Sequence, residues 1–525
     1  MRSTLLVAVP RTWQHRQMSR EIELKFRIPA GRWAALRRAV ETRTAQVQPL
    51  AAVYFDTADD ALAQARMALR LRREGGQWVQ TLKAEGANPM QRLEHNVSRD
   101  AVDGERPALD LSLHDCHGAG ALLARALAGA APLVERYATE VQRTRRVLRL
   151  AGASIEIALD QGRITAGAAP SEVREIPVCE IEFELLCGEP KDLLALAARW
   201  VARFDLVLDM RSKSERGQML ARGQTFSAPT RARSLQLPPR AGAGQVLRAM
   251  LANPLGQLLA NASQLADPAG GTPEHLHQLR VGLRRLRAVL KVYADLSPPE
   301  LVALAPALAE LFGKLGAARD LDAMAESLWP ALRSAGAPLV ELPSDASAVV
   351  DIAALLGAQS TQRLWLDLLG QCQPEVGAPD PAGLKPRQLR RLLVEPLRAL
   401  QRQVWRDADR FDRLDDAARH RLRRRIKRLR YAAELCASLW PAKTSARFMR
   451  GLQQAQTPLG EFNDLVVAQA GYLALAQSDP RAWFAVGWLS ARRPALEADC
   501  ALALARLARR PAPSSRLAPR SAAQR

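Results

Sequence analysis

The chain has 525 residues, with 75 Lys and Arg against 54 Asp and Glu, which leaves a formal net charge of +21. A chain of this length exceeds the size at which a single hydrophobic core stops growing, so we expect at least two domains. The positive charge indicates a polyanionic partner, whether nucleic acid, an anionic membrane or a phosphate polymer. No apolar run is long enough to span a bilayer and the six cysteines form no CxxC pair, which argues against a membrane protein, a zinc site and a disulfide framework.

The first 17 residues contain only a short apolar run, "TLLVAVP", and lack the small-residue cleavage signature of a secretory signal. Because Met18 directly precedes the first informative segment, residues 1–17 are predicted to be an over-extended start or disordered. The missing signal and the scattered cysteines favour a cytoplasmic protein.

The composition of the chain changes near its middle. Residues 18–220 are dominated by segments in which apolar and polar residues alternate, a pattern typical of β-strands. From residue 242 to 508, Ala, Leu and Arg recur at helical spacing instead. Residues 221–241 are rich in Pro, Gly, Ser and Arg and are predicted to be a linker, and the basic residues 509–525 a disordered tail. We therefore predict an α+β domain followed by an all-α domain.

The first predicted strand, "SREIELKF" at residues 19–26, carries charge on one face only. Side chains of a strand alternate between its two faces, so Glu21, Glu23 and Lys25 share one face and the apolar residues between them share the other. The charged face could simply be exposed to water, as in many antiparallel sheets. Alternatively, it could line the polar interior of a closed barrel.

The same pattern recurs in later strands. Arginines cluster on one strand and glutamates on two others. A sheet with one face simply exposed to solvent would instead mix polar residues of every kind on that face. The alternating or strand-terminal charges are those of Arg70, Arg72, Lys83, Glu94, Glu180, Glu182 and Glu184. A sheet closed with these residues inward would form a tunnel with carboxylates for a divalent cation and cations for phosphates.

The ExExK segment of Glu21, Glu23 and Lys25 is followed in order by "LRLR", "TLK", "RLE", "LDQG", "EIEFE" and "SKSERG". This series resembles the CYTH superfamily, the triphosphate tunnel metalloenzymes, over residues 18–220. The resemblance implies an eight-stranded antiparallel β tunnel that hydrolyses inorganic triphosphate to diphosphate and phosphate with Mg²⁺ or Mn²⁺. No GxSxG motif or Cys/His pairing indicates a covalent route.

The resemblance also assigns roles to individual residues. It makes the ExExK residues Glu21, Glu23 and Lys25 catalytic. It assigns these cations to phosphate binding: Arg70, Arg72, Lys83, Arg143 and Lys213. It assigns these carboxylates to the metal: Glu21, Glu23, Glu94, Asp160, Glu180 and Glu182. Arg145 remains an alternative to Arg143, because it also alternates correctly in "QRTRRVL".

The second half of the chain contains an internal repeat. "HQLRVGLRRLRAVL" begins at His277 and "HRLRRRIKRLRYAA" at His420, an offset of 143 residues. "GAARDLDAM" and "GEFNDLVVA" follow at an offset of 144 and pair Asp320 with Asp464, which we interpret as helix caps or salt-bridge partners. Two helical subdomains related by a pseudo-twofold axis are therefore predicted.

Each repeat carries basic residues along one helix face. In the first repeat the positions 0, 3, 7, 10 and 14 counted from His277 form a stripe about 21 Å long. The two helices resemble the CHAD domain, an inorganic polyphosphate binder often fused behind CYTH, over residues 242–508. The resemblance assigns polyphosphate binding to His277, Arg280, Arg284, Arg285, Arg287, Lys291, His420, Arg423, Lys427, Arg428 and Arg430.

The predicted partners are thus inorganic triphosphate and inorganic polyphosphate, with no membrane contact and with localisation in the cytoplasm or at polyphosphate granules. Nucleic acid is disfavoured, because aromatic residues make up only 5% of the chain and are not interleaved with the basic helices. Two alternatives stay open. The protein could be a polyphosphate-binding protein without turnover, or its tunnel could act on another triphosphate, such as thiamine triphosphate or ATP in a cyclisation reaction.

Overall fold

The computed structural model describes residues 19–100, 105–115, 118–167, 170–237, 241–338, 340, 350–374 and 386–509. The chain forms two compact units, with the boundary between Ser227 and Ala228. The predictions for residues 1–17 and for the tail from residue 510 onward lie outside the described residues.

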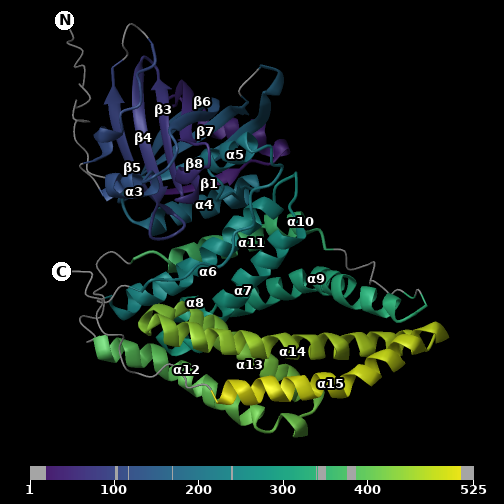
Figure 1. Cartoon of the computed structure of the whole chain (residues 1–525). Helices are drawn as coiled ribbons and strands as arrows, with labels where there is room; N and C mark the ends of the chain where they lie inside the picture. Colours follow the sequence, from purple (N-terminus) through teal and green to yellow (C-terminus); the bar gives the residue numbers. More distant parts are fainter. Residues whose placement is uncertain are drawn as a thin grey trace, which may run out of the picture. The chain divides into compact units, whose positions relative to one another are not determined.

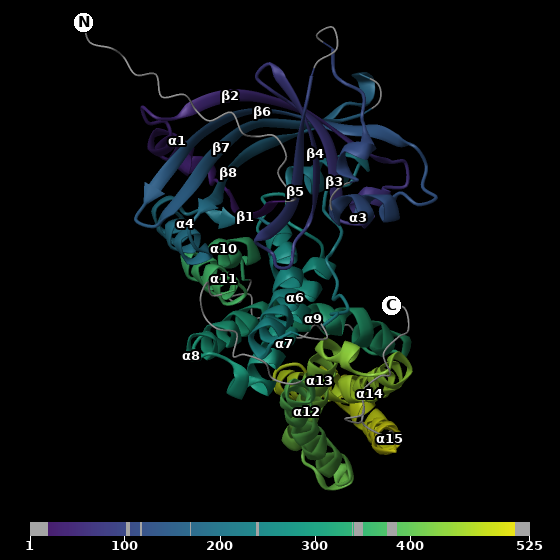
Figure 2. The ribbon, with the colours of Figure 1, turned by 90° about the vertical axis from the view of Figure 1, so that its left-hand side faces the viewer.

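The first unit is a closed antiparallel barrel (Figure 2). Its strands are β1 (Ser19–Arg27), β2 (Gln46–Thr57), β3 (Met67–Glu74), β4 (Gln77–Glu85), β5 (Gln91–Arg99), β6 (Leu133–Leu150), β7 (Ala153–Ala166) and β8 (Arg174–Cys187). They pair in the order β5-β4-β3-β2-β6-β7-β8-β1, and β1 closes the barrel by pairing with β5, where Glu21 lies opposite Arg92. The two-residue β9 (Val207–Leu208) adds to β1. The predicted eight-stranded antiparallel fold is confirmed.

Short helices accompany the strands. They are α1 (Trp33–Val40), α2 (Ala61–Gln64), α3 (Gly118–Ala126), α4 (Pro190–Phe204) and α5 (Lys213–Ala221), with 3-10 turns at Ala30–Arg32, Leu111–His114 and Pro170–Glu172.

The apolar face of β1 packs on the outside of the barrel. Leu24 and Phe26 are buried, and the Phe26 ring meets Phe183 of β8 edge to face at a centroid distance of 5.7 Å. Phe183 in turn contacts Trp200 of α4 at 5.5 Å. Because one face of a strand is occupied by this core, the alternate side chains, including Glu21 and Glu23, point into the barrel. The charged faces of β1 and β8 therefore line the interior rather than the outer surface.

Helix α5 fills one part of the barrel interior. Its Leu220 packs with Tyr54, Tyr137 and Val178, which come from three different strands. A side chain at Gly217 would place its Cβ 2.2 Å from the Tyr137 ring, so only glycine permits this close approach. The helix begins with a capping box formed by its N-cap residue and Glu215, which fixes the direction of its first turn.

The second unit is helical (Figure 1). Its helices are α6 (Ala243–Leu265), α7 (Pro273–Val292), α8 (Pro299–Val302), α9 (Ala305–Ser334), α10 (Ile352–Gly357), α11 (Gln359–Gln371), α12 (Pro386–Ala408), α13 (Asp416–Leu435), α14 (Ala442–Leu475) and α15 (Trp483–Ala508). In the described part of the chain, no helix combines the length and apolar character that crossing a bilayer requires.

The internal repeat is visible in the packing of this unit. Helix α7 contacts α9, α13 contacts α14 in the same way, and α7 and α13 contact each other. Tyr293 and Cys436 are equivalent at the offset of 143, and the Tyr293 hydroxyl lies 3.1 Å from the Cys436 sulfur. Equivalent residues touch only near a local twofold axis, so this contact places the pseudo-twofold axis close to the C-terminal ends of α7 and α13.

Candidate functional site

A cluster of three carboxylates lies inside the barrel on two neighbouring strands. Asp160 of β7 pairs in register with Glu180 of β8, and Glu182 follows two residues later on the same face. One carboxylate oxygen of each lies within 4.8 Å of the others, and Asp160 and Glu180 are buried. Oxygen ligands at this spacing fit a hard cation such as Mg²⁺ or Mn²⁺.

Cations surround this cluster on the inner wall. The Lys213 ammonium lies 2.6 Å from Asp160 and 2.9 Å from Glu182, and it also contacts Glu180. Arg143 of β6 donates two hydrogen bonds to Asp160, at 2.7 and 2.6 Å, and pairs with Glu182 as well. Each carboxylate of the cluster therefore has at least one cationic neighbour.

These contacts control the protonation of the cluster. Burial would raise the pKa of Glu182, but Lys213 and Arg143 outweigh it and hold the pKa well below its usual range. The same balance of burial against Lys213 and Arg143 lowers the pKa of Asp160. Burial also disfavours the charge of Lys213, yet its carboxylate neighbours raise its pKa. Asp160 and Glu182 are therefore ionised at neutral pH, as metal binding requires.

A second charged group lies where β1 meets β5. The Lys83 ammonium lies 3.0 Å from Glu21 and 2.5 Å from Glu94, its register partner on β5. Despite burial, Lys83 and Arg70 lower the pKa of Glu94, whereas burial, reinforced by the charge of Glu94, raises the pKa of Glu21 well above its usual value. Among the described residues, no third carboxylate joins Glu21 and Glu94 in a metal-sized group. Their assignment to a metal therefore stays a prediction.

Two carboxylates outside the sequence-based assignment line the same wall. Glu184 lies opposite Glu23 on one side and Glu156 on the other. Burial and the charge of Glu156 raise the pKa of Glu184 to about 7. The sequence pointed to both residues, because alternate residues of a strand share one face. Glu184 lies two residues after Glu182, and Glu156 lies two residues before Ala158, which also faces the interior.

The phosphate-binding candidates of β3 lie among aromatic and acidic partners. Arg70 donates a hydrogen bond of 3.2 Å to the hydroxyl of Tyr54, and it lies 4.0 Å from Glu94. Arg72 pairs with Glu74, and burial together with the charge of Arg70 lowers the pKa of Arg72. The two guanidinium groups thus form a cationic pair inside the barrel.

Lys25 and the first turn of α5 lie near each other. Lys25 donates a hydrogen bond to the carbonyl oxygen of Arg211, and burial lowers its pKa although Glu180 and Asp209 oppose this shift. Arg216, one turn after Lys213 on α5, pairs with Glu180. Arg216 was not predicted from the sequence, although it lies three residues after Lys213 in "SKSERG" and therefore on the same helix face.

Arg143 and Arg145 differ in how close they lie to the carboxylate cluster. Arg143 contacts the carboxylate cluster, whereas the Arg145 side chain is 43% exposed and lies 3.9 Å from Glu156. Arg143 is thus the closer of the two to the metal candidates.

In the helical unit, α7 and α13 bring basic residues from both repeats together. We call Arg284, Arg287, Lys291, Lys427 and Arg428 the cation cluster. Burial and the charges of Arg423 and Arg284 lower the pKa of Lys427 to about 7. The pKa of Lys291 is lowered first by Arg428 and then by burial, which shows that cations of the two helices face each other. Within the part of the chain that the structure describes, none of the cluster residues forms an ion pair with a carboxylate.

Other assigned residues lie beside the cation cluster and have partners. Arg280 donates a hydrogen bond of 3.3 Å to the carbonyl oxygen of Gly316, and Arg423 lies 3.6 Å from Asp464. The contact with Asp464 agrees with its interpretation as a salt-bridge partner. Arg430 pairs with Glu434 at 3.7 Å.

The remaining assigned residues differ in exposure. His277 is half-buried, whereas His420 is exposed and its Nδ1 contacts the Asn463 side chain. Arg285 is fully buried, with hydrogen bonds of 2.8 and 2.9 Å to Asn253 and Gln257 and an ion pair of 3.2 Å to Glu434. The side chain of Arg285 is set apart from the cation cluster, and we leave it out of the binding site proposed below.

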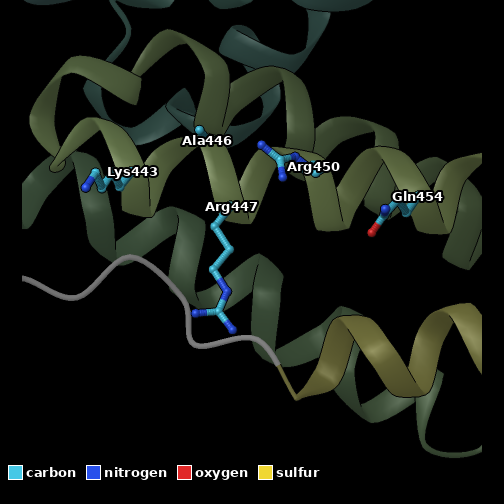
Figure 3. Close-up of a pocket in the computed structure, with 5 residues that line it drawn as sticks. All are labelled: Lys443, Ala446, Arg447, Arg450 and Gln454. Carbon is cyan, nitrogen blue, oxygen red and sulfur yellow. The ribbon is translucent and has the colours of Figure 1, made fainter.

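A shallow basic depression lies along the first half of α14 (Figure 3). It is lined by Lys443, Ala446, Arg447, Arg450 and Gln454. At the offset of 144 residues, Lys443, Arg447 and Arg450 correspond to Pro299, Ala303 and Pro306 of the first repeat. The cations that line the depression therefore belong to the second repeat alone.

Two family models match the chain. The CYTH domain model matches residues 19–217, and the CHAD domain model matches residues 249–471. A curated relative, the inorganic triphosphatase of Haemophilus influenzae, is 30% identical over 174 residues, which are 33% of this chain and 46% of the relative. The match thus spans about half of that relative's length.

The chain also has partial matches among solved structures. The CHAD domain from the plant Ricinus communis is 30% identical, with a TM-score of 0.45, and covers 55% of this chain and 99% of its own. An adenylyl cyclase candidate from Hippeastrum, described as having a dominant triphosphatase activity, is 18% identical with a TM-score of 0.26 and covers 39% of this chain and 97% of its own. Because both family models match, the chain contains a CYTH domain followed by a CHAD domain.

Proposed function

We propose that the protein is a metal-dependent inorganic triphosphatase whose helical unit binds inorganic polyphosphate. One observation carries the first half of the proposal: Asp160, Glu180 and Glu182 lie together inside a closed barrel, next to Arg143 and Lys213. A site that holds ionised carboxylates beside cations can bind a divalent metal and a polyanion at the same time. The inorganic triphosphatase relative supports the choice of substrate.

The reaction needs water as its nucleophile. Mg²⁺ or Mn²⁺, held by Asp160, Glu180 and Glu182, would neutralise charge on the phosphoryl oxygens. Arg70 and Arg72 would bind phosphate oxygens through bidentate guanidinium contacts. The water oxygen forms a bond to the terminal phosphorus while the bridging oxygen leaves with diphosphate, and a base accepts the water proton.

Glu184 is suited to accept that proton. Its pKa of about 7 lets its carboxylate oxygens take up or release a proton near neutral pH. Lys83, held between Glu21 and Glu94, keeps its charge, because these carboxylates raise its pKa against the effect of burial. It can therefore contribute positive charge toward a bound triphosphate.

A substrate panel tests this proposal. We expect phosphate release from inorganic triphosphate with Mg²⁺ or Mn²⁺, slower release from ATP and thiamine triphosphate, and none in the presence of a chelator. The measurement is phosphate release side by side from equal concentrations, with product analysis for cyclic AMP. Faster turnover of thiamine triphosphate or cyclisation of ATP would replace the proposed substrate, and no turnover of any triphosphate would favour the alternative without catalysis.

The cation cluster supports the second half of the proposal. Five cations from two helices gather without forming an ion pair with a carboxylate among the described residues, although the charge of Asp464 acts on Lys427. The cations also lower the pKa of Lys291 and Lys427, so a bound polyanion would relieve their mutual repulsion. A chain of phosphates offers charge at every unit and needs no base-stacking platform. Inorganic polyphosphate therefore fits the cluster better than nucleic acid does.

Lys427 predicts how polyphosphate binding depends on pH. Its pKa of about 7 means that this side chain is largely neutral above pH 7, and bound phosphate would raise the pKa again. Binding above pH 7 therefore requires proton uptake, and affinity should fall as pH rises from about 7, by up to about tenfold per unit.

The control for this prediction is Lys427→Arg, which stays charged across the range. Calorimetric titration with long-chain polyphosphate should show a flatter pH profile for this variant than for the wild type. An equal slope for both proteins would show that Lys427 is not the titrating group.

A further inference from the structure

Helix α5 is tied to the barrel near both of its ends. In its first turn, Lys213 contacts all three residues of the carboxylate cluster, and Arg216 pairs with one of them. Toward its other end, Gln218 donates a hydrogen bond to the carboxylate of Asp60, and Arg222 lies 2.7 Å from the same carboxylate. Asp60 therefore holds the end of α5 that lies away from the carboxylate cluster.

Three donors converge on the side chain of Asp60, which is only 10% exposed. Besides the two donors of α5, Arg136 of β6 pairs with this carboxylate at 3.1 Å. A carboxylate that is removed from water needs such partners, because burial of an uncompensated charge is costly. Loss of the negative charge would therefore remove two ion pairs at once, those with Arg136 and Arg222.

The backbone of Asp60 adopts an unfavourable conformation. Its φ of 63° and ψ of 40° lie in the left-handed region, which residues other than Gly, Asn and Asp rarely adopt. Asp60 is the N-cap residue of α2, a position where an aspartate usually accepts a hydrogen bond from its own helix, but its side chain makes no capping bond. Asp56 accepts hydrogen bonds from the first amides of α2 instead. The side chain of Asp60 is thus directed to α5, and strain of this kind clusters at functional sites.

We propose that Asp60 is a positioning residue for triphosphate binding: it holds the far end of α5 and thereby fixes where Lys213 and Arg216 lie beside the carboxylate cluster. An α-helix of nine residues is a rigid rod about 13 Å long, so a movement at one end displaces the other. The proposal rests on the triphosphatase activity proposed above. It adds a residue whose ion pairs, within the described part of the chain, are with Arg136 and Arg222 and not with the carboxylate cluster.

Asp60→Asn in the full-length protein tests this role. Asparagine also tolerates the left-handed region, so the variant removes the charge without changing the demand on the backbone. In steady-state assays with triphosphate and Mg²⁺, we expect KM to rise about tenfold and kcat to fall by no more than about threefold, because cations that bind phosphate act on the ground state and the transition state together. A purely structural defect would instead lower the fraction of active enzyme, and with it kcat, at an unchanged KM.

Asp205→Asn is the matched control. Asp205 also has a positive φ, of 52°, and pairs with an arginine, Arg32, but it lies at the end of α4 and not beside α5. This variant should leave KM unchanged. A second variant, Arg222→Met, removes the same anchor from the side of the helix and should also raise KM. It keeps the test decisive if Asp60→Asn does not fold, which circular dichroism and thermal unfolding check for each variant.

A double-mutant cycle shows whether Asp60 acts through α5. Lys213→Met removes a cation that Asp60 is proposed to position. Two residues that act through one shared element have non-additive effects. Asp60→Asn should therefore raise KM much less in the Lys213→Met background than in the wild-type background.

Three outcomes overturn the inference: a wild-type KM in the folded Asp60→Asn or Arg222→Met variant, a loss confined to kcat, or a full tenfold rise in KM in the Lys213→Met background. Failure of the proposed function is a different result, because the wild-type protein itself would then not hydrolyse triphosphate. If the wild type binds triphosphate without turnover, dissociation constants from calorimetric titration replace KM in the same comparisons.

Discussion

Replacing Glu182 by glutamine is expected to lower metal-dependent hydrolysis of triphosphate by about two to three orders of magnitude. Glu182 belongs to the carboxylate cluster and also pairs with Lys213 and Arg143. An amide keeps the shape of the side chain but removes the charge that holds a divalent cation. The remaining activity should require a higher concentration of Mg²⁺, because two carboxylates bind the ion more weakly than three.

The matched control is Glu175→Gln on the same strand. Glu175 is about half exposed on the outer face of β8, where it lies 3.4 Å from Arg163. Loss of its charge should change neither turnover nor the dependence on metal. Steady-state phosphate release at several Mg²⁺ and Mn²⁺ concentrations provides the comparison. Equal activity of Glu182→Gln and Glu175→Gln would remove Glu182 from the metal site.

Reversing the charge of Arg284 and Lys427 together is expected to weaken polyphosphate binding by at least about a hundredfold at low salt. The two residues are equivalent in the repeat, and their charges already influence each other across the pseudo-twofold axis. Two glutamates would place negative charge in the middle of the cation cluster, where each bound phosphate would meet repulsion instead of attraction. The salt dependence of the remaining binding should also become shallower.

Reversal of Arg516 and Arg520 is the control for net charge, because it changes the total charge by the same amount. If binding depended on net charge alone, both double variants would lose affinity equally. Competition with single-stranded and duplex nucleic acid completes the test. Displacement of polyphosphate at comparable phosphate concentration would reduce the assignment to a general polyanion-binding surface.

The barrel was predicted mainly from the alternation of charged and apolar residues in the first half of the chain. The alternation at Glu21, Glu23 and Lys25 is a local property of the strand and was readable without any partner. It left open whether the charged face meets water or an interior. That choice depends on what covers the apolar face, and the contact of Phe26 with Phe183, beneath α4, decides it.

The grouping of the carboxylates could not be predicted from spacing. Asp160 and Glu180 are 20 residues apart in the sequence and meet because β7 and β8 pair in one register, and a shift of one residue would turn one of them outward. Lys83 meets Glu21 only because the barrel closes between β1 and β5. The sequence therefore predicted which residue types line the interior, whereas the register decided which of them form one site.

In the helical half, too, the sequence determined some features and the packing of the helices decided others. The repeat at offset 143 and the basic residues of both helices are properties of the sequence alone, because periodicity needs no knowledge of packing. Arg284 and Arg285 are neighbours in that sequence, yet one joins the cation cluster and the other is buried with Glu434. Successive residues on a helix point about 100° apart, so the neighbouring helices decide whether a charge meets solvent or a buried partner. The ring of Phe312 beside three arginines likewise exists only once α9 has packed on α7.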